Sequence, residues 1–371
     1  MVSAISQIPS DMHGKEEMEF QKQLEHTRKY ADAFWQHEMI DRPYISIIVP
    51  PKQSTYRYSQ SACFEAGVSG EYDKFLIPYM EHLKKCHFAG EAVPSMNLNL
   101  GTDQYAGFFG ARMENGWEED TTWSVPCLKD YESFEPIIDR SEKSHYNKVK
   151  RFYEYACKMA GGRYLVEMAD LHSNMDALSA LRGAEELCMD IYDCPEEVHR
   201  VLNAVRKTYP EVYNMLYEAG NMKEMGTIGW SPIYCRGRSA VIQCDFAYIL
   251  SPEHGREFVF PAIEEEAEFL DHSIYHMDGI GELTHLDTIL AIDAIDCIQW
   301  VPGAGQPRTL EWMDLLKKIQ AAGKSLWIYD WTPEEIKAFH KELQPDKVAY
   351  TLQMESRDEA EELIEFLVKN T

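Results

Sequence analysis

Two pairs of residues in this sequence combine an imidazole with a carboxylate at a spacing of two. His276 and Asp278 follow one short apolar run, and Asp170 and His172 follow another. In an extended segment residues i and i+2 point to the same side, so each pair can act on one ligand. Histidine and aspartate together suit proton transfer or the binding of a divalent metal ion.

A metal at His276 and Asp278 would need a third ligand from another strand end. Cys244, Asp245 and Glu355 are placed to provide one, as thiolate or carboxylate. In the alternative interpretation Asp278 caps the following turn, and His276 is a core histidine or hydrogen-bonds substrate. Cys244 also has two interpretations, as a metal ligand or nucleophile and as a small buried apolar residue.

Asp170 and His172 have two interpretations of equal weight. They could form an acid–base pair, or they could cap the helix expected to start near Ser173 and Asn174.

Short apolar runs alternate with helical patterns along most of the chain. Eight parallel strands separated by helices predict a (β/α)₈ TIM barrel, with the functional residues at the C-terminal strand ends. The predicted strands are residues 95–100, 164–168, 226–229, 240–244, 273–275, 296–300, 325–329 and 348–352.

The chain divides into two predicted regions. Residues 1–94 form an α-rich N-terminal extension packed on the barrel, including a helical stretch over residues 14–42 that Pro43 ends. Residues 95–371 form the barrel domain, and the aromatic interval 105–131 is expected to cover the barrel mouth.

Further residues at the strand ends are candidates for binding substrate. Trp300 and Trp123 are expected to wall the pocket, and Gln299 and Tyr329 to line it. Gly303 either forms a tight turn or lets the backbone approach a ligand closely.

Composition excludes several classes of partner. The net charge of −26 disfavours nucleic acid and anionic membrane surfaces. The chain has no apolar run long enough to span a bilayer and starts without a signal-peptide pattern, which predicts a cytoplasmic protein. Nine cysteines without a C-x-x-C pair argue against a disulfide framework.

Three stretches are similar to the uroporphyrinogen decarboxylase superfamily. They are Y-H-M-D-G-I-G…H-L-D…I-Q-W-V-P-G-A-G from Tyr275, Q-C-D-F…S-P-E…F-V-F-P from Gln243, and T-T-W at Thr121–Trp123. More narrowly, they resemble the branch found with corrinoid-dependent methyltransferases of anaerobic microbes. The resemblance covers roughly residues 95–371, and it implies a TIM barrel with the site at its top.

Two departures from the superfamily pattern bear on function. The arginine-containing R-Q-A-G-R-Y segment, which grips the carboxylates of uroporphyrinogen, is replaced here by R-P-Y-I-S-I-I-V-P, so uroporphyrinogen is a poor substrate. The methyltransferases bind zinc through H-x-C and a later cysteine. Here Asp278 replaces the first cysteine, and Gln353, Met354 and Glu355 lie near the place of the second.

The resemblance therefore implies a corrinoid-dependent methyltransferase or demethylase acting on a small substrate, with the corrinoid carried by a partner protein. His276 and Asp278 would orient or activate the substrate, with or without zinc held also by Glu355 and Cys244. Asp245 and Asp170 would act as acid–base or positioning groups, and His172 would contact substrate.

Two alternatives stay open. One is a metal-free lyase or decarboxylase whose pocket contains arginines such as Arg236, Arg238 or Arg308, and the other is a non-enzymatic corrinoid or tetrapyrrole binder. Any of these could be a homodimer.

Overall fold

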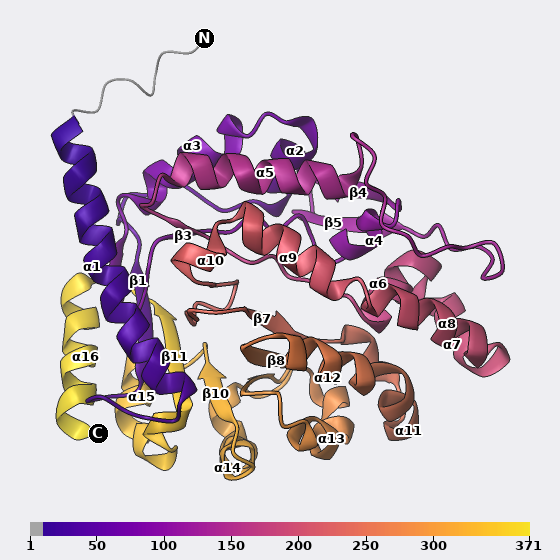
Figure 1. Cartoon of the computed structure of the whole chain (residues 1–371). Helices are drawn as coiled ribbons and strands as arrows, with labels where there is room; N and C mark the ends of the chain where they lie inside the picture. Colours follow the sequence, from indigo (N-terminus) through magenta and orange to yellow (C-terminus); the bar gives the residue numbers. More distant parts are fainter. Residues whose placement is uncertain (1–9) are drawn as a thin grey trace.

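The computed structural model describes residues 10–371, with side chains from residue 17 onward. Residues 1–9, part of the predicted N-terminal extension, lie outside this range. The largest element is a sheet of seven strands, all parallel except β2 at one edge (Figure 1). Across the sheet the strands are β2 (His87–Gly90), β1 (Tyr44–Val49), β11 (Val348–Gln353), β10 (Ser325–Ile328), β9 (Cys297–Val301), β8 (His272–Asp278) and β7 (Ser239–Ile242).

The remaining strands form two smaller sheets of two strands each. β3 (Ser95–Met96) pairs in parallel with β6 (Leu165–Val166), and β4 (Arg112–Gly116) forms an antiparallel hairpin with β5 (Thr121–Val125). The mixed α/β class with a parallel sheet is therefore confirmed.

The hydrogen bonds of the described residues do not close a barrel, contrary to the prediction. β3 and β6 form a sheet of their own, since residues 226–229, a predicted strand, do not join either sheet. This segment makes an isolated antiparallel bridge between Thr227 and Cys235 and one bond from Met168 N–H to the Ile228 carbonyl.

Strand β1 was not among the predicted strands. It lies inside residues 1–94, where a mainly helical extension was expected, and pairs along its length with β11. Its neighbour α1 (Ser10–Trp35) runs beside it (Figure 1). The domain boundary at residue 94 stays a prediction, but this region supplies part of the main sheet.

Helices connect the parallel strands and surround the sheets (Figure 1). The longer ones are α2 (Gln60–Ser69), α3 (Asp73–Leu83), α5 (His145–Ala160), α7 (Ala184–Asp193), α8 (Pro195–Arg206), α9 (Tyr209–Ala219), α12 (Phe260–Phe269), α14 (Met313–Ala321) and α16 (Arg357–Asn370). The shorter ones are α4 (Gln104–Phe108), α6 (Met175–Arg182), α10 (Met222–Met225), α11 (Pro252–His254), α13 (Leu286–Ala291) and α15 (Pro333–Phe339). Within residues 10–371 none of these helices has the length and apolar character needed to cross a bilayer.

Side chains alternate between the two faces of the main sheet, and each face has its own apolar core. The face that packs against α16 is called the outer face, and the opposite face is called the inner face. Residues on the outer face, such as Ile45 and Ile47 of β1, pack with Leu363 and Leu367 of α16. Inner-face residues near the strand starts form a separate core that contains Tyr44, Val241, Ile274, Cys297, Trp327 and Ala349.

Helix α1 covers this inner core at the N-terminal ends of the strands. Phe34 and Trp35 belong to the inner core, and the Trp35 ring stacks on His272 at the start of β8, with centroids 4.6 Å apart. The opposite, C-terminal end of the sheet is left for the polar residues.

A buried ion pair anchors β1 beneath α1. The Arg42 guanidinium donates to both carboxylate oxygens of Glu91, at 2.9 and 2.8 Å, and both side chains are almost fully buried. Glu91 also accepts from the Ile45 backbone N–H at 2.8 Å, while its carbonyl accepts from Thr27 of α1. The pair thus links α1, the entry to β1 and the end of β2.

Glu91→Gln should lower the free energy of unfolding by about 3–5 kcal/mol, because Arg42 would keep its buried charge without a counter-ion. Urea unfolding followed by circular dichroism measures this. Glu71→Gln is the matched control, since the Lys74–Glu71 pair is exposed and should change stability by less than about 1 kcal/mol. Equal losses in the two variants would contradict the role given to Glu91.

Candidate functional site

Above the apolar inner core, the same strands present polar side chains. On β8, Ile274 belongs to the inner core, and His276 and Asp278 follow it at intervals of two. Gln299 stands in the same relation to Cys297 on β9, and Gln243, directly after β7, in the same relation to Val241. Asp245 follows at the start of η1 (Asp245–Ile249). The inner face therefore changes from apolar to polar toward the C-terminal strand ends.

A cavity of about 620 Å³ opens at these strand ends. Its walls come from the segment after β3, from β5, from α6 and the segment before it, from the 3₁₀ helix η1 (Asp245–Ile249) and from the end of β8. The charged residues that line it are His172, Asp103, Asp176, Asp245 and Asp278. Among the described lining residues there is no lysine or arginine, so the cavity is strongly acidic.

His172 is held between two carboxylates. Its Nε2 lies 3.1 Å from Asp170 Oδ2, and its Nδ1 lies 2.9 Å from Asp176 Oδ2. Burial alone would lower the pKa of His172, but the Asp170 and Asp176 carboxylates outweigh burial and raise that pKa well above its ordinary value. At neutral pH this imidazole is therefore protonated.

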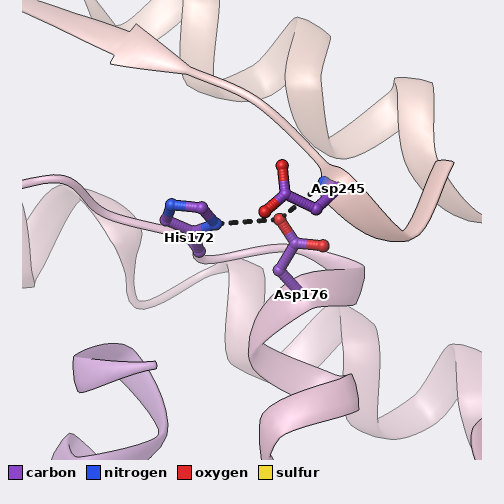
Figure 2. Close-up of side chains that lie close together, drawn as sticks. All are labelled: His172, Asp176 and Asp245. Carbon is purple, nitrogen blue, oxygen red and sulfur yellow. Dashed lines mark hydrogen bonds and ion pairs between the residues drawn. The ribbon is translucent and has the colours of Figure 1, made fainter. Parts of the chain in front are cut away.

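Asp176 joins helix α6 to the segment that leaves β7. Its Oδ2 accepts from the backbone N–H of Asp245 at 2.9 Å (Figure 2), and its Oδ1 accepts from the backbone N–H of Phe246 at 2.9 Å. Asp176 thus caps the start of η1 and brings Asp245 next to His172, although these residues are about 70 positions apart in sequence.

Asp245 extends into the cavity beside Asp176. Burial, with the Asp176 carboxylate as the next cause, raises the pKa of Asp245 from 3.8 to about 6. One oxygen, Oδ1, accepts from the Gln243 amide at 3.2 Å. A carboxyl group with a pKa near 6 can give or take a proton close to neutral pH.

His276 is fixed by the neighbouring strand. The register pairs His276 with Gln299, and His276 Nδ1 lies 2.6 Å from Gln299 Oε1. The other ring nitrogen, Nε2, lies 3.9 Å from Asp278 Oδ2. The Trp230 indole meets the His276 ring edge to face, with centroids 5.2 Å apart.

Two buried glutamates support the cavity walls. Ser173 donates to Glu266, and Tyr275 donates to Glu282, which also accepts from the Asp278 backbone N–H at 3.1 Å. Burial raises the pKa of each glutamate to about 8. Both are therefore mainly neutral at pH 7 and add little to the negative charge of the cavity.

Several predicted site residues come together at this end of the sheet. Asp170, His172, Asp245 and Asp278 form or border the cavity, with His276 and Gln299 next to Asp278. Neither Asp170 nor His172 caps the following helix, since Asn174 is the N-cap of α6. Their roles in a reaction stay predictions.

Two predicted residues lie on the outer face. Trp300 is 1% exposed and packs against Trp312, so it does not reach the cavity it was expected to wall. Cys244 is fully buried in the outer core, and its thiol is directed toward Asp176 Oδ1 at 3.5 Å. Trp300 directly follows the inward-pointing Gln299, and Cys244 directly follows the inward-pointing Gln243. Neighbouring side chains in a strand point to opposite faces, so Trp300 and Cys244 point outward.

The remaining predicted residues lie at the rim. The Trp123 indole is 39% exposed on β5 and donates to Glu114, next to Ser124, which lines the cavity. Tyr329 follows β10 and contacts Trp327 edge to face. Gly303 has a positive φ of 92° in the turn after β9, and Glu355 is exposed beyond β11.

The predicted metal ligands do not converge. Among the described residues, donor atoms of His172, Asp176 and Asp245 lie within 4.8 Å of one another, and no other histidine, cysteine or carboxylate group of three does so. Sequence reasoning missed Asp176. The available signal was a carboxylate in the first turn of the helix expected after His172, four residues along the chain.

Comparison with known proteins gives a fold likeness. The structure is similar to a methyltransferase from Methanosarcina mazei, with a TM-score of 0.60 over 93% of this chain and 98% of the other. The two sequences are 11% identical, so the likeness concerns the fold alone. No protein-family model and no curated protein matches this chain in sequence.

Glu282→Gln should make the protein less sensitive to alkaline pH. The folded-state pKa of Glu282 lies above its ordinary value of 4.5, so wild-type stability falls as pH rises from about 4.5 to 8. Glutamine keeps the shape of the Glu282 side chain but cannot ionise. Thermal unfolding at pH 5 to 8 should show a smaller decline for Glu282→Gln than for wild type or the exposed control Glu268→Gln. Parallel declines would contradict a neutral buried Glu282.

Proposed function

We propose that this protein is a methyltransferase or demethylase that moves a methyl group between a small substrate and a corrinoid carried by a partner protein. The main support is the acid-lined cavity at the C-terminal strand ends of a fold that resembles a methyltransferase. Its volume of about 620 Å³ suits a small molecule. We further propose that the two parallel sheets are arcs of one (β/α)₈ barrel.

The residues of the cavity have separate roles in this proposal. Asp245 exchanges a proton with the substrate, since burial and Asp176 bring its pKa near neutrality. Asp170 and Asp176 fix His172, and Gln299 fixes His276, so both imidazoles contact substrate in set orientations. The partner would approach over the exposed rim residues Tyr248 and Ile249.

Zinc is part of the proposal as a Lewis acid. When bound, it would lower the pKa of a methyl acceptor or polarise a methyl donor. His276 and Asp278, whose facing atoms lie 3.9 Å apart, could supply two ligands. Cys244 is unavailable to this pair because it points to the outer face, and Glu355 is exposed beyond β11.

The lyase or decarboxylase alternative has less support. It requires cationic side chains that hold a carboxylated substrate, and Arg236, Arg238 and Arg308 were the candidates. Arg236 pairs with Asp32 of α1, Arg308 pairs with Glu335, and the Arg238 guanidinium lies over the Phe269 ring. None of the three lines the cavity.

The proposed activity can be tested with free cob(I)alamin as the methyl acceptor. Purified protein is mixed without oxygen with methyl ethers, methylamines or methyl thioethers, and formation of methylcob(III)alamin is followed by its absorbance. We expect turnover with at least one donor class. Asp245→Asn should reduce the rate about 100-fold or more, because the proton donor is lost.

Asp293→Asn is the matched control, since Asp293 is exposed and precedes the N-terminal end of β9, opposite the cavity. Its rate should equal that of wild type. Corrinoid binding without methyl transfer would favour the non-enzymatic binder instead. Equal rates for Asp245→Asn and Asp293→Asn would contradict the role of Asp245.

A further inference from the structure

We propose that His172, Asp176 and Asp245 hold a divalent metal ion, with Asp170 fixing His172 in position as a ligand. The three side chains converge from two segments, His172 and Asp176 around the start of α6 and Asp245 at the exit of β7 (Figure 2). Ligand atoms of one ion lie at most about 4.2 Å apart when each bond is about 2.1 Å. A contraction of roughly half an ångström from the present 4.8 Å limit would complete the set.

One hydrogen bond of His172, from Nε2 to Asp170, matches that of a metal-ligating histidine, and a metal ion would take the place of the proton that Nδ1 shares with Asp176. Such a histidine donates one ring N–H to a carboxylate and turns its other nitrogen to the metal. His172 Nε2 meets Asp170 Oδ2 at 3.1 Å, and Nδ1 faces Asp176 at 2.9 Å on the side of Asp245. Asp170 is therefore a positioning residue in this proposal, and it touches the metal only through His172.

The charges around the cluster are unbalanced. Asp170, Asp176 and Asp245 surround one imidazole, Asp103 and Asp278 line the same cavity, and none of its described lining residues is a lysine or arginine. A purely structural role explains Asp176, which caps η1, but it does not explain why a second carboxylate, Asp245, lies beside it in a cavity whose described lining has no lysine or arginine. A divalent ion would offset two of these negative charges.

Two buried oxygens next to the cluster provide independent support. Asp170 is 8% exposed and Gln243 is 5% exposed. Asp170 Oδ1 and Gln243 Oε1 find no hydrogen-bond donor among the described residues, although the Gln243 amide nitrogen reaches Asp245 Oδ1. Buried acceptors rarely lack a partner, so a ligand that supplies positive charge or ordered water is expected here.

The donor set indicates the class of ion. One imidazole and two carboxylates suit Zn²⁺ or Mn²⁺ better than Mg²⁺, which prefers oxygen ligands alone. None of the three ligands of this site belongs to the His276–Asp278 pair considered above. The inference does not require methyl transfer, because it concerns a binding site that could also serve another reaction. Asp245 is a ligand while the ion is bound, and the proton exchange proposed for it above belongs to the site without the ion.

Metal binding by the full chain, purified without a histidine tag and stripped with a chelator, tests the inference. Zn²⁺ binding is measured by titration calorimetry, and Mn²⁺ binding by the loss of the free-ion paramagnetic resonance signal. We expect one ion per chain whose binding depends on His172, Asp176 and Asp245. Asp245→Asn should weaken binding at least tenfold, and Asp170→Asn about 10- to 100-fold through the orientation of His172. Asp293→Asn, outside both sites, should bind as wild type does.

X-ray absorption of the zinc-loaded wild-type protein adds a test that needs no variant. One imidazole and otherwise only oxygen scatterers are expected, whereas a sulfur scatterer at about 2.3 Å would overturn the assignment. Absence of binding in wild type would also overturn it, as would loss of binding in His276→Ala with full binding in Asp245→Asn. None of these readouts depends on catalysis, so failure of the cobalamin assay would leave the metal site intact.

Discussion

Side chains alternate between the two faces of the parallel strands, and this alternation decides where the apolar core and the polar site lie. Val241, Ile274 and Cys297 begin the inward rows of β7, β8 and β9, and α1 seals them at the N-terminal end. Two positions later the same rows carry Gln243, His276 and Gln299, and Asp278 follows His276 by two more. One residue pattern therefore supplies both an apolar base and a polar cavity above it, with no separate domain.

Asp176 gives this cavity its geometry, and the geometry is electrostatically costly. By accepting two backbone N–H groups at the start of η1, it places Asp245 beside a carboxylate of the same charge. Burial keeps Glu266 and Glu282 mainly neutral beneath the cavity, which limits the repulsion. Such strain at a polar cluster is typical of functional sites, where stability is given up for chemistry.

Much of the fold could be predicted from sequence, because apolar runs and helix periodicity are local signals. They located β7 to β11 and the acidic strand ends. They missed β1, since its partner β11 lies about 300 residues away, and they assigned residues 226–229 to a strand that the chain does not form. Strict use of the alternation would have placed Trp300 and Cys244 on the outer face. Asp176 needed the tertiary structure, since only the docking of η1 on α6 brings Asp245 to it.

The acidic lining constrains what the cavity can bind, whichever reaction it serves. Asp103, Asp176, Asp245 and Asp278 repel an anionic substrate unless a cation is bound with it. This argues against carboxylate-rich tetrapyrroles, which the missing arginine segment already made poor candidates. A metal ion at His172, Asp176 and Asp245 would offset part of this negative charge and allow an electron-rich oxygen, nitrogen or sulfur atom to approach. The position of the charge, more than the shape of the cavity, therefore decides which class of small molecule can enter.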